Sequence, residues 1–290
     1  MSLPDGFQFS QSNLQDYVDC PRRFQLRSLL HLSWPAIEAS PALENERFLL
    51  LGSTFHYLIR QHQTGLSIEQ LSSIIDHSPP SERELLSQWW ESYLAALRTP
   101  GELYPILHSD AICTPEITLS APLGNYRLVA KYDLLVFDPG GQAVIIDWKT
   151  NQSRPPRRSL MEKLQTKVYP YLLVRAGMGV AGGRQIHPSQ VEMLYWFANY
   201  PDQTERFLYS DEQFQADERY IYNLIDQIRQ APNIDYPLTH DERRCHFCVY
   251  RSLCERGIQA GQLDERLSAD LTAVELDFDF DLEQIDEIEY

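Results

Sequence analysis

Apolar positions in the first third of the chain recur with the three-to-four-residue spacing of helices. The predicted helices cover residues 10–30, 43–63, 67–76 and 81–97, with Ser10 as the N-cap of the first helix and Pro21 as its break. Pro100-Gly101 ends this helical stretch. We therefore predict a helical region at the start of the fold, with a helical insertion over residues 64–110 before a sheet.

The spacing changes to the alternation of strands in the middle of the chain. Predicted strands cover residues 112–120, 126–137, 142–150, 191–197 and 205–209, with turns at Gly124-Asn125 and Pro139-Gly140-Gly141. Helices are expected over residues 159–175 and 211–230. Strands with helices on either side predict an α/β fold with a central mixed β-sheet flanked by helices.

Charge is distributed unevenly along the 290 residues. Residues 270–290 carry nine carboxylates and no Lys or Arg, which is more than half of the net charge of −16. We therefore divide the chain into a domain over residues 1–262 and an acidic tail over residues 263–290. The composition of the tail favours disorder or the docking of a protein partner. A further hypothesis is that its repeated Asp and Phe imitate a DNA backbone.

Basic residues gather in three groups, so the negative net charge does not exclude nucleic acid as a partner. The groups are Arg22, Arg23 and Arg27; Arg154, Arg157, Arg158, Lys163 and Lys167; and Arg243, Arg244, Arg251 and Arg256. Local fields attract phosphates whatever the total charge is. The alternative is an ordinary solvated surface. There is no run of eighteen apolar residues and no signal sequence, so we expect a cytoplasmic protein that does not enter a membrane.

An apolar strand ends in Asp147-Trp148-Lys149, which places a carboxylate and an ammonium group on the same strand face. The preceding strand carries Asp133, which a hairpin would bring beside Asp147. Two carboxylates suit a hard cation such as Mg²⁺, while the lysine could steer a water molecule or stabilise phosphorane charge. A D-x-K tripeptide also occurs by chance as an exposed ion pair, so the spacing alone leaves both interpretations open.

Two helices offer further groups to this strand end. His56 lies one turn after Gly52, whose missing side chain would admit another chain or a nucleic acid, and a neutral imidazole could bind a metal ion. Gln165 and Tyr169 share one face of the helix after the strand, where they could orient a phosphate or a base. The alternatives are a satisfied core or surface histidine and an ordinary helix surface.

Five cysteines in a cytoplasmic chain favour metal binding or simple burial over disulfides. Cys245, Cys248 and Cys254 have the spacing C-x₂-C-x₅-C, and a tetrahedral thiolate site needs a fourth ligand, for which Cys20 is the candidate. Four thiolates accept zinc as well as an iron–sulfur cluster, and His246 could replace one thiolate in a zinc site. Cys113 has no partner in this pattern and is expected to be buried in a strand.

The motifs resemble, in order and spacing, those of the RecB-type branch of the PD-(D/E)XK nuclease superfamily. They are His56, Asp133, Asp147-Trp148-Lys149 and Gln165-Thr166-Lys167-Val168-Tyr169. The resemblance implies a restriction-endonuclease-like core that hydrolyses DNA, with single-stranded DNA or DNA ends as the expected substrate. Two positions depart from the family pattern: Ala130 replaces a glycine before Asp133, and Pro170 should kink the helix after Tyr169.

The same resemblance implies roles for these residues. Mg²⁺ or Mn²⁺ would be bound by His56, Asp133, Asp147 and the main-chain carbonyl of Trp148. Lys149 would be the catalytic lysine, and Gln165 and Tyr169 would orient the DNA.

The cysteine spacing resembles the CRISPR-associated exonucleases, the AddB nuclease and related helicase–nucleases, in which one cysteine precedes the nuclease core and three follow it. The resemblance implies a [4Fe–4S] cluster bound by Cys20, Cys245, Cys248 and Cys254, as a clasp that joins the N-terminal segment to residues 240–257; Zn²⁺ is the alternative. We expect a DNA nuclease, an exonuclease by preference, that acts in DNA repair and recombination or in CRISPR adaptation. The alternative is a non-catalytic DNA-binding or assembly subunit that retains the nuclease fold.

Overall fold

The structure, a computed structural model, describes residues 3–32, 40–108, 110–231, 234–245 and 248–257, with the backbone alone for residues 40–46. The strands are β1 (Gln8–Ser10), β2 (Ile112–Leu123), β3 (Tyr126–Phe137), β4 (Ala143–Lys149), β5 (Val191–Phe197) and β6 (Glu205–Leu208). The helices before β2 are α1 (Gln11–Asp19), α2 (Pro21–Phe24), the π-helical turn η1 (Gln25–Leu29), α3 (Ser40–Gln63), α4 (Ile68–Asp76), α5 (Pro80–Ala96) and α6 (Leu103–Leu107). The later helices are α7 (Arg157–Glu162), α8 (Leu164–Ala176), α9 (Asp211–Gln230) and the short 3₁₀ turns η2 (Pro188–Gln190), η3 (Glu242–Cys245) and η4 (Arg251–Cys254).

Six strands form one mixed sheet in the order β1-β3-β4-β5-β6, with β2 paired to β3. β2 and β3 make a long antiparallel hairpin, and β4 is antiparallel to β3. β4 and β5 run parallel and are connected through α7 and α8. The predicted mixed sheet is thus confirmed, and the C-terminal end of β4 lies inside it rather than at an edge.

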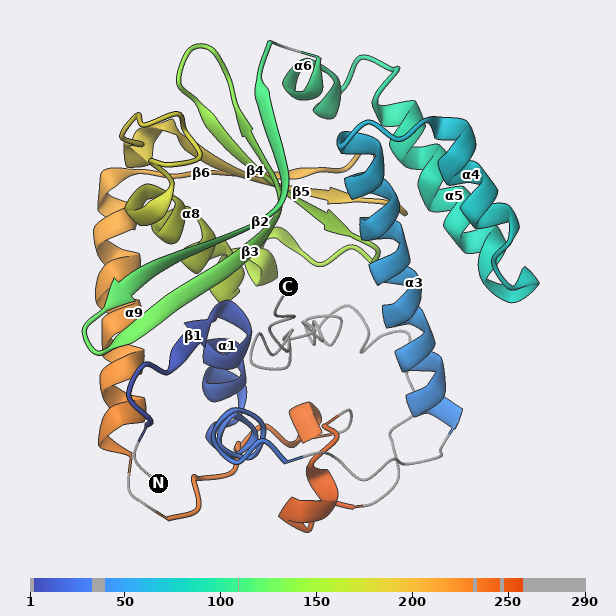
Figure 1. The fold of residues 1–290 in the computed structure, drawn as a ribbon. Helices are drawn as coiled ribbons and strands as arrows, with labels where there is room; N and C mark the ends of the chain where they lie inside the picture. The colour runs from blue at the N-terminus through green and yellow to red at the C-terminus, as the bar shows by residue number, and fades with distance from the viewer. Residues whose placement is uncertain (1–2, 33–39, 109, 232–233, 246–247, 258–290) are drawn as a thin grey trace, which may run out of the picture.

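Each face of the sheet is covered by its own hydrophobic core. One core packs the strands against α1, α8 and α9, and the other packs them against α3, α4 and α5 (Figure 1). Ile145 of β4 enters the first core, whereas Ile146 and Trp148 enter the second. Because side chains alternate along a strand, Asp147 and Lys149 continue the face that α8 covers.

The first predicted helix is interrupted where the sequence indicated. The Ser10 hydroxyl accepts a hydrogen bond from the Asn13 N–H, and the Asn13 side chain accepts one from the Ser10 N–H, which caps α1. Cys20 is extended, with a φ of −161°, and Pro21 then starts α2. Proline suits the first position of a helix because it lacks only an N–H that would be unpaired there anyway. Cys20 therefore lies at a defined break between two helices.

Two predictions about helices are wrong. The helical stretch does not end at Pro100-Gly101, because a short helix, α6, follows. Leu103 of α6 packs into the core between α3 and the sheet. The helix predicted over residues 159–175 is divided at Lys163, whose ψ is 143°. There the Leu164 N–H donates to the side chain of Gln15 in α1 instead of to a helical carbonyl. α8 runs past Pro170 as far as Ala176.

The N-terminal helices meet residues from the other end of the domain. The side chain of Gln25 donates to the Ile234 carbonyl and accepts from the Tyr236 N–H at 3.0 and 2.8 Å. The Tyr250 hydroxyl donates to the Leu32 carbonyl at 3.0 Å. Figure 1 shows the segment after α9 lying beside α1 and α2. The two segments that carry the clasp cysteines are therefore neighbours in the fold.

The acidic tail over residues 263–290 and the zinc alternative that uses His246 lie outside the described residues. Among the helices that are described, none has the length and apolar composition required to span a lipid bilayer.

Candidate active site

Asp147 and Lys149 lie side by side at the end of β4. The Lys149 ammonium is 2.9 Å from Asp147 Oδ2. Gln165 of α8 contacts both residues: its Nε2 donates to Asp147 Oδ1 at 2.5 Å, and its Oε1 accepts from Lys149 Nζ at 3.0 Å. The three residues are 3%, 7% and 4% exposed. Charged side chains are rarely buried to this extent without a function or a partner, so the D-x-K tripeptide is not a solvated surface pair.

Asp133 joins this strand end from β3. Extending the β3–β4 register beyond Leu134↔Ile146 places Asp133 opposite Asp147. Asp133 Oδ2 accepts the backbone N–H of Trp148 at 2.9 Å, and Oδ1 is 3.2 Å from Nδ1 of His56 on α3. The structure thus brings His56 to Asp133, with Asp147 on the neighbouring strand. The Asp147 carboxylate contacts Lys149 and Gln165 and is not among the ligand atoms that lie within 4.8 Å of one another.

Glu116 of β2 completes this group, and sequence reasoning missed it. One nitrogen or carboxylate oxygen from each of His56, Glu116 and Asp133 lies within 4.8 Å of the other two, which could hold a metal ion. The hairpin register leaves Glu116 opposite Asp133, between Pro115↔Leu134 and Ile117↔Tyr132. A two-residue turn at Gly124-Asn125 fixes this register, so counting back from the turn would have identified Glu116. We refer to His56, Glu116, Asp133, Asp147, Lys149 and Gln165 as the carboxylate site.

The backbone is distorted where Glu116 of β2 lies opposite Asp133 of β3. Glu116 has a φ of +52°, in the left-handed region that residues with a side chain seldom occupy, and its carboxylate forms an ion pair with Lys131. The packing also changes here, because Tyr132 faces the α8 core whereas Leu134 faces the α3 core. Strain of this kind costs stability and tends to persist at functional sites.

Charges within the site shift the pKa values of its members. Burial opposes the charged form of His56, but the charge and hydrogen bond of Asp133, with contributions from Asp147 and Glu116, raise the pKa of His56 to about 9. Burial also opposes the charge of Asp133, yet His56, the Trp148 N–H and Lys149 hold the pKa of Asp133 below its ordinary value. In the metal-free protein, protonated His56 therefore neutralises part of the carboxylate charge at neutral pH.

The residues after Lys149 are held between α3 and the turn that follows β5. A methyl group added at Gly52 of α3 would lie 3.0 Å from the Thr150 hydroxyl, so this glycine admits the chain's own strand end. On the other side, the Asn199 amide donates to the carbonyls of Asn151 and Thr150 at 2.8 and 3.3 Å, and its oxygen accepts from the Trp89 indole at 2.9 Å. The approach of another chain or a nucleic acid at Gly52 stays a prediction.

Gln165 and Tyr169 do not lie on an ordinary helix surface. Tyr169 is 5% exposed; its ring lies 4.9 Å from that of Tyr132, and its carbonyl accepts the Tyr132 hydroxyl at 2.9 Å. Gln165 binds the site's own charged groups. The Trp148 ring is buried in the core between the sheet and α3, whereas the backbone N–H of Trp148 donates to Asp133. The DNA contacts of Gln165 and Tyr169, and the metal contact of the Trp148 carbonyl, remain predictions.

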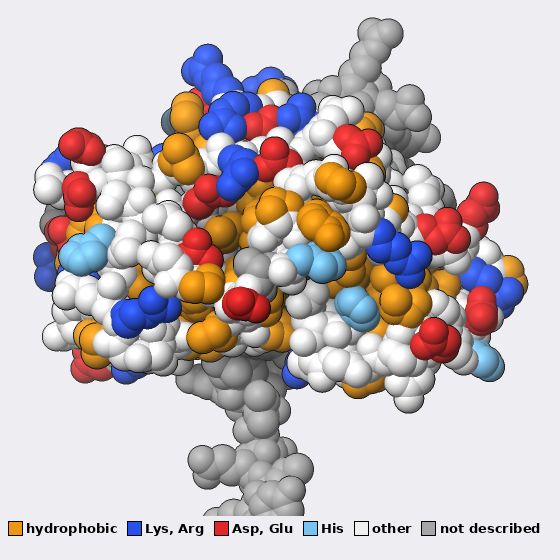
Figure 2. Space-filling model, turned by 90° about the horizontal axis from the view of Figure 1, so that it is seen from above, with side chains coloured by type: hydrophobic (Ala, Val, Ile, Leu, Met, Phe, Trp, Pro, Cys, Tyr) orange, Lys and Arg blue, Asp and Glu red, His pale blue; other side chains and the backbone are white. Residues whose placement is uncertain are grey.

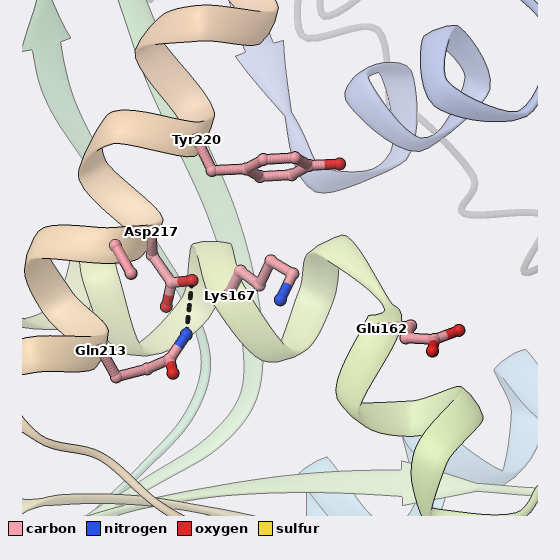
Figure 3. Close-up of a pocket in the computed structure, with 6 residues that line it drawn as sticks. Glu162, Lys167, Gln213, Asp217 and Tyr220 are labelled. Carbon is pink, nitrogen blue, oxygen red and sulfur yellow. Dashed lines mark hydrogen bonds between the residues drawn. The ribbon is translucent and has the colours of Figure 1, made fainter.

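Lys167 lies on the side of α8 opposite Gln165, because two residues correspond to about 200° around a helix. It lines a cavity of about 440 Å³ between α7–α8 and α9, together with Glu162, Gln213, Asp217 and Tyr220 (Figure 3). The Lys167 ammonium is 5.9 Å from the centre of the Tyr220 ring. Since two carboxylates share this cavity, it is not a basic surface for a phosphate backbone.

Most arginines of the predicted basic groups pair with carboxylates of the same chain. The pairs are Arg22–Asp235, Arg23–Asp16, Arg27–Asp16, Arg154–Glu205, Arg157–Glu205, Arg158–Glu162, Arg243–Asp241, Arg244–Asp19 and Arg256–Glu242. On the face drawn in Figure 2, Lys and Arg are likewise interspersed with Asp and Glu. These groups support the fold, and by themselves they do not identify a DNA-binding surface.

Cys20, Cys245, Cys248 and Cys254 form a second candidate site, which we call the cysteine clasp. Cys20 is 8% exposed, and the other three cysteines are partly buried. Burial raises the pKa of Cys248 to about 11, and repulsion from Cys20 and Cys254 adds to this rise. Burial raises the pKa of Cys254 too, with repulsion from Cys20 and Cys245. The four thiols thus interact with one another, and a bound cation would reverse these shifts by favouring the thiolates.

The spacing of the thiols differs from that of the carboxylate site. No three of these four thiols, all of them described, have their sulfur atoms within 4.8 Å of one another. A single tetrahedral zinc ion with Zn–S bonds of about 2.3 Å would hold its sulfurs roughly 3.8 Å apart. Cys113 lies in β2, partly buried, where it was expected.

The chain is similar to known proteins in its sequence pattern and in its fold. The model of a family described as "PD-(D/E)XK nuclease superfamily" matches residues 8–255, which include the whole carboxylate site and all four clasp cysteines. No curated protein matches the sequence. A crystal structure from Eubacterium rectale, described as a "Putative exonuclease", is similar over 93% of this chain and 94% of its own, with a TM-score of 0.51 and 12% sequence identity. The structure named SSO0001 covers 89% and 90%, with a TM-score of 0.38 and 13% identity, and carries no weight. The likeness to the Eubacterium rectale structure concerns the fold, and it confirms the predicted α/β architecture.

Proposed function

Because the chain belongs to the PD-(D/E)XK nuclease superfamily, we propose that it is a metal-dependent deoxyribonuclease whose active centre is the carboxylate site. The observation that carries this proposal is the convergence of His56, Glu116 and Asp133 beside the buried pair of Asp147 and Lys149. Three strands and two helices supply these groups. A structural ion pair would need two residues, not six.

The donor set fits Mg²⁺ or Mn²⁺. Two carboxylates that face each other across a strand pair repel one another, and a cation between them would remove this cost. We propose His56, Glu116, Asp133, Asp147 and the main-chain carbonyl of Trp148 as the groups that would hold the ion. When bound, such an ion polarises a phosphate oxygen and lowers the pKa of a water molecule. Hard cations favour oxygen ligands, and a histidine nitrogen is accepted more readily by Mn²⁺ than by Mg²⁺.

Lys149 is the residue that we assign to the chemistry of the phosphate. Its ammonium is held at a fixed place by Asp147 and Gln165, and it lies 5.5 Å from the centre of the Tyr195 ring. In a site with little water, a fixed ammonium stabilises developing phosphorane charge without reorganisation. It can also steer the attacking water molecule. Gln165 holds Lys149 and Asp147 in register, and we propose that it and Tyr169 contribute to orienting the DNA.

Single-stranded DNA or a DNA end is the substrate that we propose. Tyr57 of α3 follows His56 directly and is 46% exposed. Exposed aromatic rings let successive bases stack without regard to sequence. The Eubacterium rectale protein with a similar fold is described as a "Putative exonuclease", which agrees with action at an end. The pathway, DNA repair and recombination or CRISPR adaptation, stays a prediction.

The cysteine clasp is proposed to bind a [4Fe–4S] cluster, with Zn²⁺ as the alternative. Support comes from the repulsion among the four thiols, which a bound cation would relieve. The preference for the cluster over zinc rests on the order and spacing of the cysteines in the sequence. The group would tie Cys20 to the segment that follows α9. We assign it no step in the hydrolysis.

The test is cleavage of end-labelled single-stranded DNA in the presence of Mn²⁺ or Mg²⁺. The full chain should cleave, whereas Asp133→Asn and Asp147→Asn should not. Asp226→Asn serves as the matched control, because Asp226 pairs with Arg229 on the exposed side of α9. An intact parent protein that binds DNA but never cleaves it would favour a non-catalytic DNA-binding or assembly subunit instead.

The assignment of Glu116 has its own test. Glu116→Gln should raise the Mn²⁺ concentration needed for half-maximal cleavage by about tenfold or more, which is typical when a metal site loses one of its supporting groups. An unchanged Mn²⁺ requirement would exclude Glu116 from the ion's ligands and leave the other residues in place.

A further inference from the structure

Tyr195 of β5 lies directly beside the charged end of β4. In the parallel pairing of β4 and β5, Tyr195 is opposite Asp147, and Phe197 is opposite Lys149. Paired residues of neighbouring strands point to the same face of a sheet, so Tyr195 shares the face that α8 covers with both charged residues. The side chain of Tyr195 is buried, and its ring centre is 5.5 Å from the Lys149 ammonium. The ring therefore forms part of the immediate surroundings of Lys149.

The Tyr195 hydroxyl is anchored to the two helices that follow β4. It lies 2.7 Å from the Thr166 hydroxyl of α8, which in turn bonds to the Leu160 carbonyl of α7. Because a carbonyl can only accept, Thr166 directs its proton to Leu160, and the Tyr195 hydroxyl donates to Thr166. The Phe207 ring of β6 packs edge-on against the Tyr195 ring, with 5.9 Å between the ring centres. These contacts hold the aromatic ring in one place and orientation.

The ring offers Lys149 a contact of a different kind from its polar partners. The ammonium is 2.9 Å from the Asp147 carboxylate and donates to Gln165 at 3.0 Å. The face of an aromatic ring attracts a cation through its negative charge density, more strongly where water is excluded. Lys149 is only 7% exposed. Since this attraction needs no particular N–H direction, it persists when the ammonium turns a hydrogen bond from its protein partners toward a phosphate oxygen.

We propose that Tyr195 is a positioning residue for Lys149, whose ammonium its ring holds in place while the lysine acts on the phosphate. The inference rests on the proposed function, in which Lys149 stabilises phosphorane charge. Tyr195 is buried, so it acts through the lysine and not on the DNA itself. A charge held in position lowers the energy of the transition state more than that of the bound substrate. Weakening the ring contact should therefore lower kcat and leave KM nearly unchanged.

The test weakens the ring face without removing the ring. Phenylalanines with increasing numbers of ring fluorine atoms are placed at position 195 of the full chain, because fluorine withdraws electrons from the ring face and reduces its attraction for a cation. Values of kcat and KM are measured with labelled single-stranded DNA and Mn²⁺. Tyr195→Phe keeps the ring face and should cleave within about threefold of the parent rate. From that level, kcat should fall stepwise with fluorination, by about tenfold for the most fluorinated ring.

The same fluorinated residues at Phe137 are the matched control. Phe137 lies in the same core, opposite Ala143 and thus at the other end of β4 from Lys149. If kcat did not depend on fluorination at position 195, the inference would be overturned while the proposed function stands. An equal decline at position 137 would overturn it too, because altered core packing would then explain the loss. A parent protein that cleaves no DNA would overturn the proposed function, and the inference with it.

Discussion

The carboxylate site and the cysteine clasp are held by the fold in different ways. The carboxylate site stands on β2, β3, β4, α3 and α8, and its closest apolar neighbours, such as Phe55 and Trp148, belong to a large buried core. The clasp lies at the junction of α1 and α2 and on the short turns η3 and η4, with Cys248 between these two turns. Around it, ion pairs and single hydrogen bonds make many of the contacts, for example between Arg244 and Asp19.

This difference separates a site that the protein builds alone from one that depends on what it binds. Apolar burial is non-directional and extensive, so the strands and helices around the carboxylate site keep their geometry without a ligand. Segments with few buried apolar contacts open at low free-energy cost unless something cross-links them. We expect loss of the catalytic ion to leave the fold intact, and loss of the clasp metal to weaken it.

The largest expected effect is on catalysis, at the carboxylate site. Lys149→Met keeps the length of the side chain and removes its charge, so cleavage by the folded protein should fall by about 10²- to 10⁴-fold. Lys167→Met, on the far side of α8, is the matched control and should cleave at nearly the parent rate. Initial rates with labelled single-stranded DNA give the comparison. Comparable activity of the two variants would remove Lys149 from the mechanism.

At the clasp, the effect should be on stability. Cys248→Ser should lower the free energy of unfolding by about 2–4 kcal/mol, the range for loss of a cross-link that closes a long loop. Cys113→Ser changes the same atoms at a site without other thiols and should cost less than about 1 kcal/mol. Urea unfolding of the metal-loaded proteins measures both. If the two midpoints shifted equally, the clasp would not be cross-linked.

The pH dependence of stability sharpens the view of the carboxylate site. The pKa of His56 is raised to about 9, above the value of about 6.5 expected in the unfolded chain. Its ion pair with Asp133 therefore stabilises the metal-free protein fully below pH 6.5, and this contribution fades as the pH rises through 9. With EDTA present, the parent should be more stable than His56→Gln below pH 6.5. As the pH rises from 6.5 through 9, this difference in unfolding free energy should shrink by an amount on the order of 1–2 kcal/mol. A pH-independent difference would contradict the pairing.

The smallest expected effect concerns the close approach of α3. Gly52→Ala adds a methyl group 3.0 Å from the Thr150 hydroxyl, which must shift by a few tenths of an ångström. Alanine favours the helix by up to about 1 kcal/mol, so stability should change little or rise slightly. Cleavage should fall several-fold, because Thr150 follows Lys149 directly. Ser53→Ala, on the next position of α3, should leave cleavage unchanged.

Much of the fold and of the site follows from patterns that are local in the sequence. The alternation in β4 correctly placed Asp147 and Lys149 on one face, and the hairpin correctly brought Asp133 to them. Glu116 could have been predicted in the same way, by counting back from the Gly124-Asn125 turn. An isolated glutamate in a strand, however, belongs to no motif that would single it out. The split at Lys163 was not accessible, because it depends on Gln15, some 150 positions earlier.

The sequence alone determined the order of the long helices and of strands β2 to β6, the faces on which most of their side chains lie, and the spacing of the motifs. These features depend on backbone geometry and on neighbours within a few residues, which the chain encodes directly. Only the tertiary structure decided that most arginines of the basic groups form ion pairs and that Gly52 admits Thr150. Such contacts join elements distant in the chain, and they are fixed by the packing of a whole core rather than by any local pattern.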